Sequence, residues 1–131
     1  MKKFLKMLAI VITALVILFT GFFLYISRGL DAKSQPVLAG VTAQGLKDGT
    51  YEGGYNGGRW TNRIKVTVVG EKIGNIALTQ DVMFSDAKAS TALFERVIAA
   101  QSTQVDTVAG ATVTSKAYLK SIENALTGKE E

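Results

Sequence analysis

The chain has 131 residues, which leaves room for one domain and one accessory segment. Its net charge of +4 lies in residues 1–47 (six basic, one acidic, +5) rather than in residues 48–131 (nine basic, ten acidic, −1), which predicts no nucleic-acid partner. Cysteine and histidine are absent, which excludes disulfides, thiol catalysis, iron–sulfur ligation by cysteine and histidine-based triads or zinc sites, so any redox chemistry needs an organic cofactor.

The first element is an apolar run of twenty uncharged residues, Met7 to Ile26. A run of ~20 residues is long enough to cross the hydrocarbon core of a bilayer as a helix. Lys2, Lys3 and Lys6 precede it closely, so the positive-inside rule places the N-terminus in the cytoplasm and the rest of the chain outside. The sequence therefore predicts a transmembrane signal anchor over residues 1–27.

Two other interpretations of this run are less favoured. A cleavable signal peptide has an apolar region of ~7–15 residues that ends at a small-x-small site, whereas this run is longer and leads into Phe22-Phe23-Leu24-Tyr25-Ile26 without such a site. A buried helix of a soluble protein is a weak interpretation, because this segment is apolar on every face. Residues 28–47 follow, mixing small and polar residues with Pro36, the only proline, and we expect an extracytoplasmic linker there.

The expected domain, residues 48–131, opens with a β-rich part. Residues 48–58 contain five glycines, but their spacing matches no nucleotide-binding fingerprint, so we predict a strand followed by a turn at residues 56–58. Two runs rich in β-forming residues, 64–69 and 73–78, flank a short turn with Gly70 and predict a hairpin with one buried face.

Helical patterns follow the hairpin. Residues 81–91 are polar and are expected to be irregular, whereas the stretch from about 92 to 101 shows an apolar stripe typical of a helix. A second amphipathic helix follows residue 114; its expected buried face is Tyr118, Leu119, Ile122, Ala125 and Leu126. The order of elements predicts an α+β fold, in which a small antiparallel sheet packs with two helices and is preceded by one N-terminal transmembrane helix.

The most informative stretch lies directly before the last helix, at residues 106–115. A small Ala-Gly-Ala turn precedes two hydroxyl residues, Thr112 and Thr114. Such a turn leaves backbone N–H groups unpaired at the start of a helix, where the helix dipole also favours an anion such as a phosphate. The hydroxyl of Thr112 is then a ligand for that phosphate or its point of covalent attachment. The simpler alternative is a helix start with Thr or Ser as its cap.

Asp106, then Gly-Ala-Thr at 110–112, then Thr-Ser at 114–115, resemble the flavinylation motif of the FMN-binding domain family. That family includes the flavin-carrying C subunit of the sodium-pumping NADH:quinone reductase and the G subunit of the Rnf electron-transport complex. In it, a membrane-bound flavin transferase joins FMN to the threonine through a phosphoester. The family usually has Ser or Thr where this chain has Ala109. The cofactor-binding residues that the resemblance implies are Thr112 (the covalent FMN phosphoester), Gly110, Ala111, Thr114, Ser115 and Asp106.

The resemblance implies a membrane-anchored, extracytoplasmic flavoprotein that carries covalent FMN and relays electrons between a membrane donor, a quinone or a flavoprotein, and an outer acceptor. Its expected partners are then the electron donor, the electron acceptor, the membrane and the flavin transferase. The resemblance also implies an electron carrier rather than a stand-alone enzyme, and we expect no metal site. Trp60, Tyr51 and Tyr55 are candidates to pack against the isoalloxazine ring. The alternatives are a cofactor-free interaction module at the cell surface and a reductase that holds FMN non-covalently.

Overall fold

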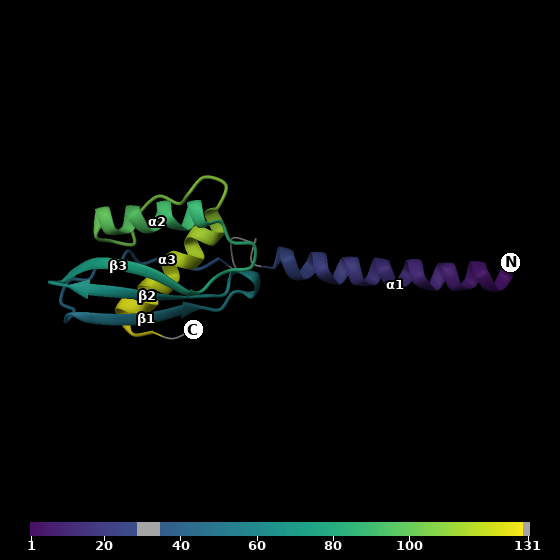
Figure 1. The fold of residues 1–131 in the computed structure, drawn as a ribbon, viewed down its shortest axis with the longest axis horizontal. Helices are drawn as coiled ribbons and strands as arrows, with labels where there is room; N and C mark the ends of the chain where they lie inside the picture. The colour runs from purple at the N-terminus through teal and green to yellow at the C-terminus, as the bar shows by residue number, and fades with distance from the viewer. Residues whose placement is uncertain (29–34, 130–131) are drawn as a thin grey trace.

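A computed structural model describes residues 1–28 and 35–129 of the chain (Figure 1). Its elements are α1 (Lys2–Ser27), β1 (Gly49–Tyr55), the 3₁₀ helix η1 (Gly58–Trp60), β2 (Asn62–Val69), β3 (Lys72–Gln80), α2 (Ala87–Ala100) and α3 (Thr112–Thr127). The three strands form one antiparallel sheet in the order β1-β2-β3. The expected α+β fold, with a long apolar helix before it, is confirmed.

Helix α1 has 26 residues, none of them buried, and extends away from one end of the domain (Figure 1). At 1.5 Å per residue this length corresponds to about 39 Å, more than the ~30 Å of a bilayer core. The helix is therefore long and apolar enough to cross a membrane.

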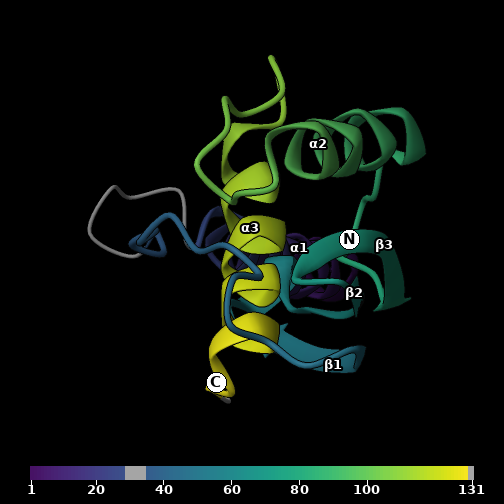
Figure 2. The same cartoon turned by 90° about the vertical axis from the view of Figure 1, so that its left-hand side faces the viewer.

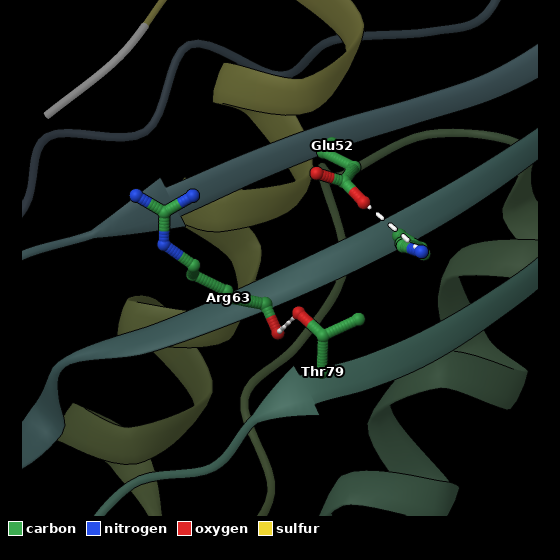
Figure 3. A network of polar contacts seen from close by, with 4 residues as sticks. Glu52, Arg63 and Thr79 are labelled. Carbon is green, nitrogen blue, oxygen red and sulfur yellow. Dashed lines mark hydrogen bonds and ion pairs between the residues drawn. The ribbon is translucent and has the colours of Figure 1, made fainter.

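The central strand β2 shows the alternation that the sequence predicts. Ile64, Val66 and Val68 are fully buried, whereas Arg63 before them and Lys65 between the first two face solvent. The outward face carries polar contacts between strands: Lys65 pairs with Glu52 of β1 at 3.1 Å, and the Thr79 hydroxyl donates a hydrogen bond to the Arg63 carbonyl (Figure 3). The sheet therefore has one apolar face for packing and one solvated face, as is common for antiparallel sheets.

The apolar face of the sheet is covered by α3, which crosses behind β1 and β2 in Figure 1 and stands beside the strands in Figure 2. Gly53 of β1 permits this close approach, because a Cβ at that position would lie 2.2 Å from the backbone nitrogen of Ala125 and 2.3 Å from the carbonyl oxygen of Ser121. The expected buried face of α3 is confirmed: the buried residues include Tyr118, Leu119, Ile122, Ala125 and Leu126. Helix α2 packs beside α3 and along β3.

One expectation for α2 is wrong, because the helix begins at Ala87 within the stretch expected to be irregular. The carboxylate of Asp86 accepts a hydrogen bond from the backbone N–H of Lys88 at 2.9 Å and so caps the helix. Aspartate is among the best N-cap residues, and alanine is the best helix former. The polar composition of the stretch reflects a capped first turn with a solvent-facing side.

The segment expected to be a linker also differs from the expectation over its second half. Ala43 is only 1% exposed, and the N–H groups of Ala39 and Gly40 each donate to the carboxylate of Glu123 in α3 at 2.9 Å. The packed unit therefore begins before residue 48, because buried carboxylate oxygens need donors and this segment supplies them. Residues 29–34 of the expected linker lie outside the described residues.

Candidate cofactor site

The motif loop before α3 is fixed from both of the helices beside it. The Nη1 of Arg96 in α2 donates to the carbonyl oxygens of Asp106 and Thr107 at 3.0 and 3.1 Å. The hydroxyl of Ser115 in α3 accepts a hydrogen bond from the N–H of Val108 at 3.1 Å. These contacts satisfy backbone groups of an irregular segment and hold it in one shape.

The loop ends in a tight turn that leaves the start of α3 uncapped. The N–H of Ala111 donates to the carbonyl of Val108 at 3.0 Å, and Gly110 has a φ of +78°, a left-handed conformation that glycine adopts without strain. Ala111 is the N-cap residue and has no capping side-chain hydrogen bond, so the alternative of a Thr or Ser cap is wrong. The N–H groups of the first turn, which starts at Thr112, are therefore open to an external anion.

A pocket of about 470 Å³ lies at this helix start. Its lining comes from three segments of the chain: η1 with Arg59 and Trp60, the start of α2 with Phe84, Asp86 and Ala89, and residues 110–114. Pockets for small ligands and cofactors are typically about 300–1,000 Å³ and combine apolar walls with a few polar groups. The size and the mixed lining suit a cofactor.

The wall contributed by η1 is cationic and aromatic. The guanidinium carbon of Arg59 lies 4.0 Å from the ring centroid of Trp60 and 6.0 Å from that of Phe84. The Nε of Arg59 is buried and has no hydrogen-bond partner among the described residues. Phe84 is 66% exposed and has a φ of +58°, which is uncommon for a bulky residue. The N–H of Met83 donates to the Arg59 carbonyl at 2.9 Å and ties the two segments together.

Of the predicted cofactor-binding residues, the structure brings four together in this pocket: Gly110, Ala111, Thr112 and Thr114. Thr112 is exposed, so its hydroxyl is accessible. Ser115 is 2% exposed and holds the loop instead of lining the pocket. Asp106 lines a separate concavity beside Arg96 and Ala109.

The three aromatic candidates are also separated. Trp60 lines the pocket, whereas Tyr51 and Tyr55 do not; the Tyr51 hydroxyl donates to the Lys47 carbonyl at 2.7 Å. Sequence reasoning did not single out the other lining residues: Arg59, Phe84, Asp86, Ala89 and Val113. The one signal for the second segment was the apolar run Val82-Met83-Phe84 inside a polar stretch.

A tyrosine links α3 to the segment that leads into α2. The Tyr118 hydroxyl donates to the carboxylate of Asp81 at 2.5 Å, and its ring meets that of Phe94 edge-on at 5.6 Å. Burial, then the hydrogen bond and the negative charge of Asp81, raise the pKa of Tyr118 well above its usual value. The phenol therefore stays protonated and keeps this link at neutral pH.

The model of the FMN-binding domain family matches residues 45–127, which is more than half of the chain. The match includes β1, the hairpin, both domain helices and every pocket residue. The chain belongs to the FMN-binding domain family. No curated protein matches it.

The residues present fit FMN. The uncapped start of α3 suits its phosphate, and the exposed Phe84 offers ring surface for the isoalloxazine, whereas Trp60 is only 3% exposed and lies beneath the Arg59 guanidinium. The buried Nε of Arg59 is a donor without a protein acceptor, and flavin carries several acceptor atoms. The pocket therefore supplies a complementary group for each part of the cofactor.

Proposed function

We propose that this protein is a membrane-anchored electron carrier that holds FMN covalently on Thr112, outside the membrane. The observation that carries the proposal is the place of Thr112. It is the first residue of a helix whose N-terminus has no side-chain cap, and its exposed side chain lines a cofactor-sized pocket within the FMN-binding domain.

The attachment forms a phosphoester. The Oγ1 of Thr112 would bond to the FMN phosphorus of a flavin dinucleotide donor, the phosphoanhydride bond to the donor's nucleoside monophosphate would break, and the threonine proton would pass to that leaving group or to water. The backbone N–H groups at the start of α3 stabilise the phosphate charge, each through a charge-assisted hydrogen bond. A flavin transferase is the partner that the family resemblance implies for this step. A permanent bond keeps the carrier loaded where free FMN is scarce.

FMN supplies the redox chemistry when bound, by taking up and releasing electrons at its ring system. The protein contributes attachment, orientation and a polar surround. Helix α1, with lysines at 2, 3 and 6 in its first two turns, anchors the domain and directs it outward. The proposed electron partners are a membrane donor, a quinone or another flavoprotein, and an acceptor outside the membrane.

A second candidate is a domain that holds FMN without a covalent bond and reduces a small substrate directly. It is favoured by the pocket wall of Arg59 and Phe84, which offers an exposed aromatic ring and a cation independently of Thr112. The two functions differ in one observable property. Colour that stays with the polypeptide after denaturation supports covalent attachment, and colour released into solution supports the second candidate.

The test is peptide mass spectrometry of the full chain co-expressed with a flavin transferase. Wild-type protein should carry the added mass of FMN, less one water, on the peptide with Thr112, and Thr112→Ala should abolish the adduct. Thr114→Ala is the matched control, because Thr114 lies two residues further along the same helix and lines the same pocket. This variant loses a hydroxyl and should keep the adduct on Thr112. An adduct on Thr114, or on no residue of the wild type, contradicts the assignment.

A further inference from the structure

We propose that Arg59 sets the redox potential of the bound flavin by stabilising the negative charge that the ring gains on reduction. This inference rests on the proposed function, since it needs FMN in the pocket beside Thr112. It assigns a task to a side chain that neither the motif nor the family match singles out.

The guanidinium of Arg59 has neither a carboxylate partner nor an acceptor for its Nε among the described residues. The ion pair found among the described residues joins Lys65 and Glu52, so no described carboxylate neutralises Arg59. Its Nε is buried without an acceptor, and leaving a buried donor unpaired is unfavourable, most of all on a charged group. Buried polar groups without a partner are rare in folded proteins, and a redox or catalytic role is one of the explanations for them.

The same side chain is held in place. Its guanidinium is stacked on the Trp60 ring at 4.0 Å, and arginine favours such stacking because its planar charge is weakly hydrated. The backbone of η1 is fixed by the Met83 N–H, which donates to the Arg59 carbonyl, and by the Trp60 N–H, which donates to the Gly57 carbonyl at 3.2 Å. A charge fixed before the ligand arrives acts on it without reorganisation.

The position of Arg59 in the pocket favours the flavin ring over the phosphate. The phosphate must lie at Thr112, where the helix N–H groups already serve it, and the ribityl chain separates it from the ring. Arg59 comes from η1, together with Trp60, and faces Phe84. The exposed ring of Phe84, which can receive the isoalloxazine, and the unpaired cation are therefore parts of one wall.

The other charged group of the pocket does not cancel this effect. Asp86 lines the pocket, but its carboxylate accepts the hydrogen bond from the Lys88 N–H and lies at the positive end of α2. The carboxylate is thus partly neutralised by its own helix. The positive charge of Arg59 is therefore the stronger electrostatic influence on the flavin ring.

Reduction of the flavin adds two electrons and one proton, so the ring gains one negative charge. The electrons come from the membrane donor proposed above, or from dithionite in the experiment. A fixed cation favours the charged product. Removing it should make reduction about tenfold less favourable, which lowers a two-electron potential by about 30 mV.

The experiment uses the full chain in detergent, loaded by a co-expressed flavin transferase, and measures the flavin potential by equilibration with reference dyes. Arg59→Gln should lower the potential by about 30 mV, the tenfold change just stated. Arg59→Met, which keeps length and apolar contact with Trp60, should do the same if the glutamine variant fails to fold. Arg59→Lys keeps the charge and should stay within threefold of wild type.

Arg63→Gln is the matched control, because Arg63 lies on the outward face of the sheet and outside the pocket (Figure 3). Its potential should equal that of the wild type. Equal potentials in wild type, Arg59→Gln and Arg59→Met would overturn the inference. So would a folded Arg59→Gln protein that fails to acquire FMN, because the guanidinium would then serve attachment. Wild-type protein that acquires no FMN would instead overturn the proposed function, and this inference with it.

Discussion

Helices α2 and α3 begin at the same pocket, and they begin differently. At α2, the Asp86 carboxylate accepts a hydrogen bond from the Lys88 N–H at 2.9 Å. At α3, Ala111 occupies the same position and offers no side-chain acceptor. Both starts contribute to the lining of the pocket.

The difference teaches what the open helix start is for. A carboxylate or hydroxyl cap stabilises a helix by about 1 kcal/mol, so an alanine at this position forgoes that stabilisation. The first turn of α2 is capped by the Asp86 carboxylate, whereas the first turn of α3 presents positive partial charge and open N–H groups to the pocket. The open start coincides with the motif that resembles a flavinylation site, which agrees with a phosphate as the external cap.

The largest effect is expected where the sheet holds α3. Gly53→Ala places a Cβ 2.2 Å from the Ala125 nitrogen, so the helix must shift, and we expect a loss of about 3 kcal/mol or more in unfolding free energy, with loss of FMN loading. Gly74→Ala is the control, because its Cβ meets only the Thr67 carbonyl at 3.6 Å. Urea unfolding of both variants checks this. Equal stability of the two would mean that α3 does not need the close approach.

The next prediction removes the difference between the two helix starts by placing a carboxylate at the N-cap of α3. In Ala111→Asp the new carboxylate lies beside the site expected for the phosphate, and like charges should reduce FMN loading about tenfold, equivalent to ~1.4 kcal/mol. Ala111→Asn is similar in shape but neutral, and its loading should fall by less. The loaded fraction is measured from intact mass. Loading of the Asp variant at the wild-type level would argue against a phosphate at this helix start.

The reverse change at α2 sharpens the comparison. Asp86→Ala removes the cap, and we expect a loss of about 1 kcal/mol, or about 4–8 °C in Tm for a domain of this size. Asp86→Asn removes the charge but keeps a capping oxygen, so its Tm should stay close to that of the wild type. Differential scanning calorimetry separates the two. If both variants lose the same stability, the carboxylate acts through its charge and not as a cap.

The smallest effect concerns the link between the two helices. Tyr118→Phe removes the hydrogen bond to the exposed Asp81, and we expect a loss of roughly 0.5–1 kcal/mol at neutral pH. The raised pKa of Tyr118 means that its stabilisation is complete below about pH 10, the unfolded value, and declines as pH rises toward the folded one. Stability measured from pH 8 to 11 should decline less steeply in the variant. Parallel curves would show that Tyr118 is not the group responsible.

Much of the fold could be predicted from the sequence, because local pattern and burial agree there. The hairpin of β2 and β3 follows from alternating residues around a two-residue turn, in which Gly70 and Glu71 have φ values of +59° and +60°. The start of α2 was missed, since a capped, solvent-facing first turn resembles a polar loop in composition. The packing of residues 38–46 was missed as well, because its donors and acceptors meet only across the folded chain, at Glu123.

By itself, the sequence determined the long apolar N-terminal helix, the α+β class and the place of the motif threonine before the last helix, because each depends on neighbouring residues. Only the tertiary structure decided which groups surround that threonine. It brought Arg59, Trp60 and Phe84 to the start of α3, and it left Asp106 and Ser115 outside the pocket. The physical reason is that a pocket is formed by contacts between distant segments, which follow from packing and not from the order of residues along the chain.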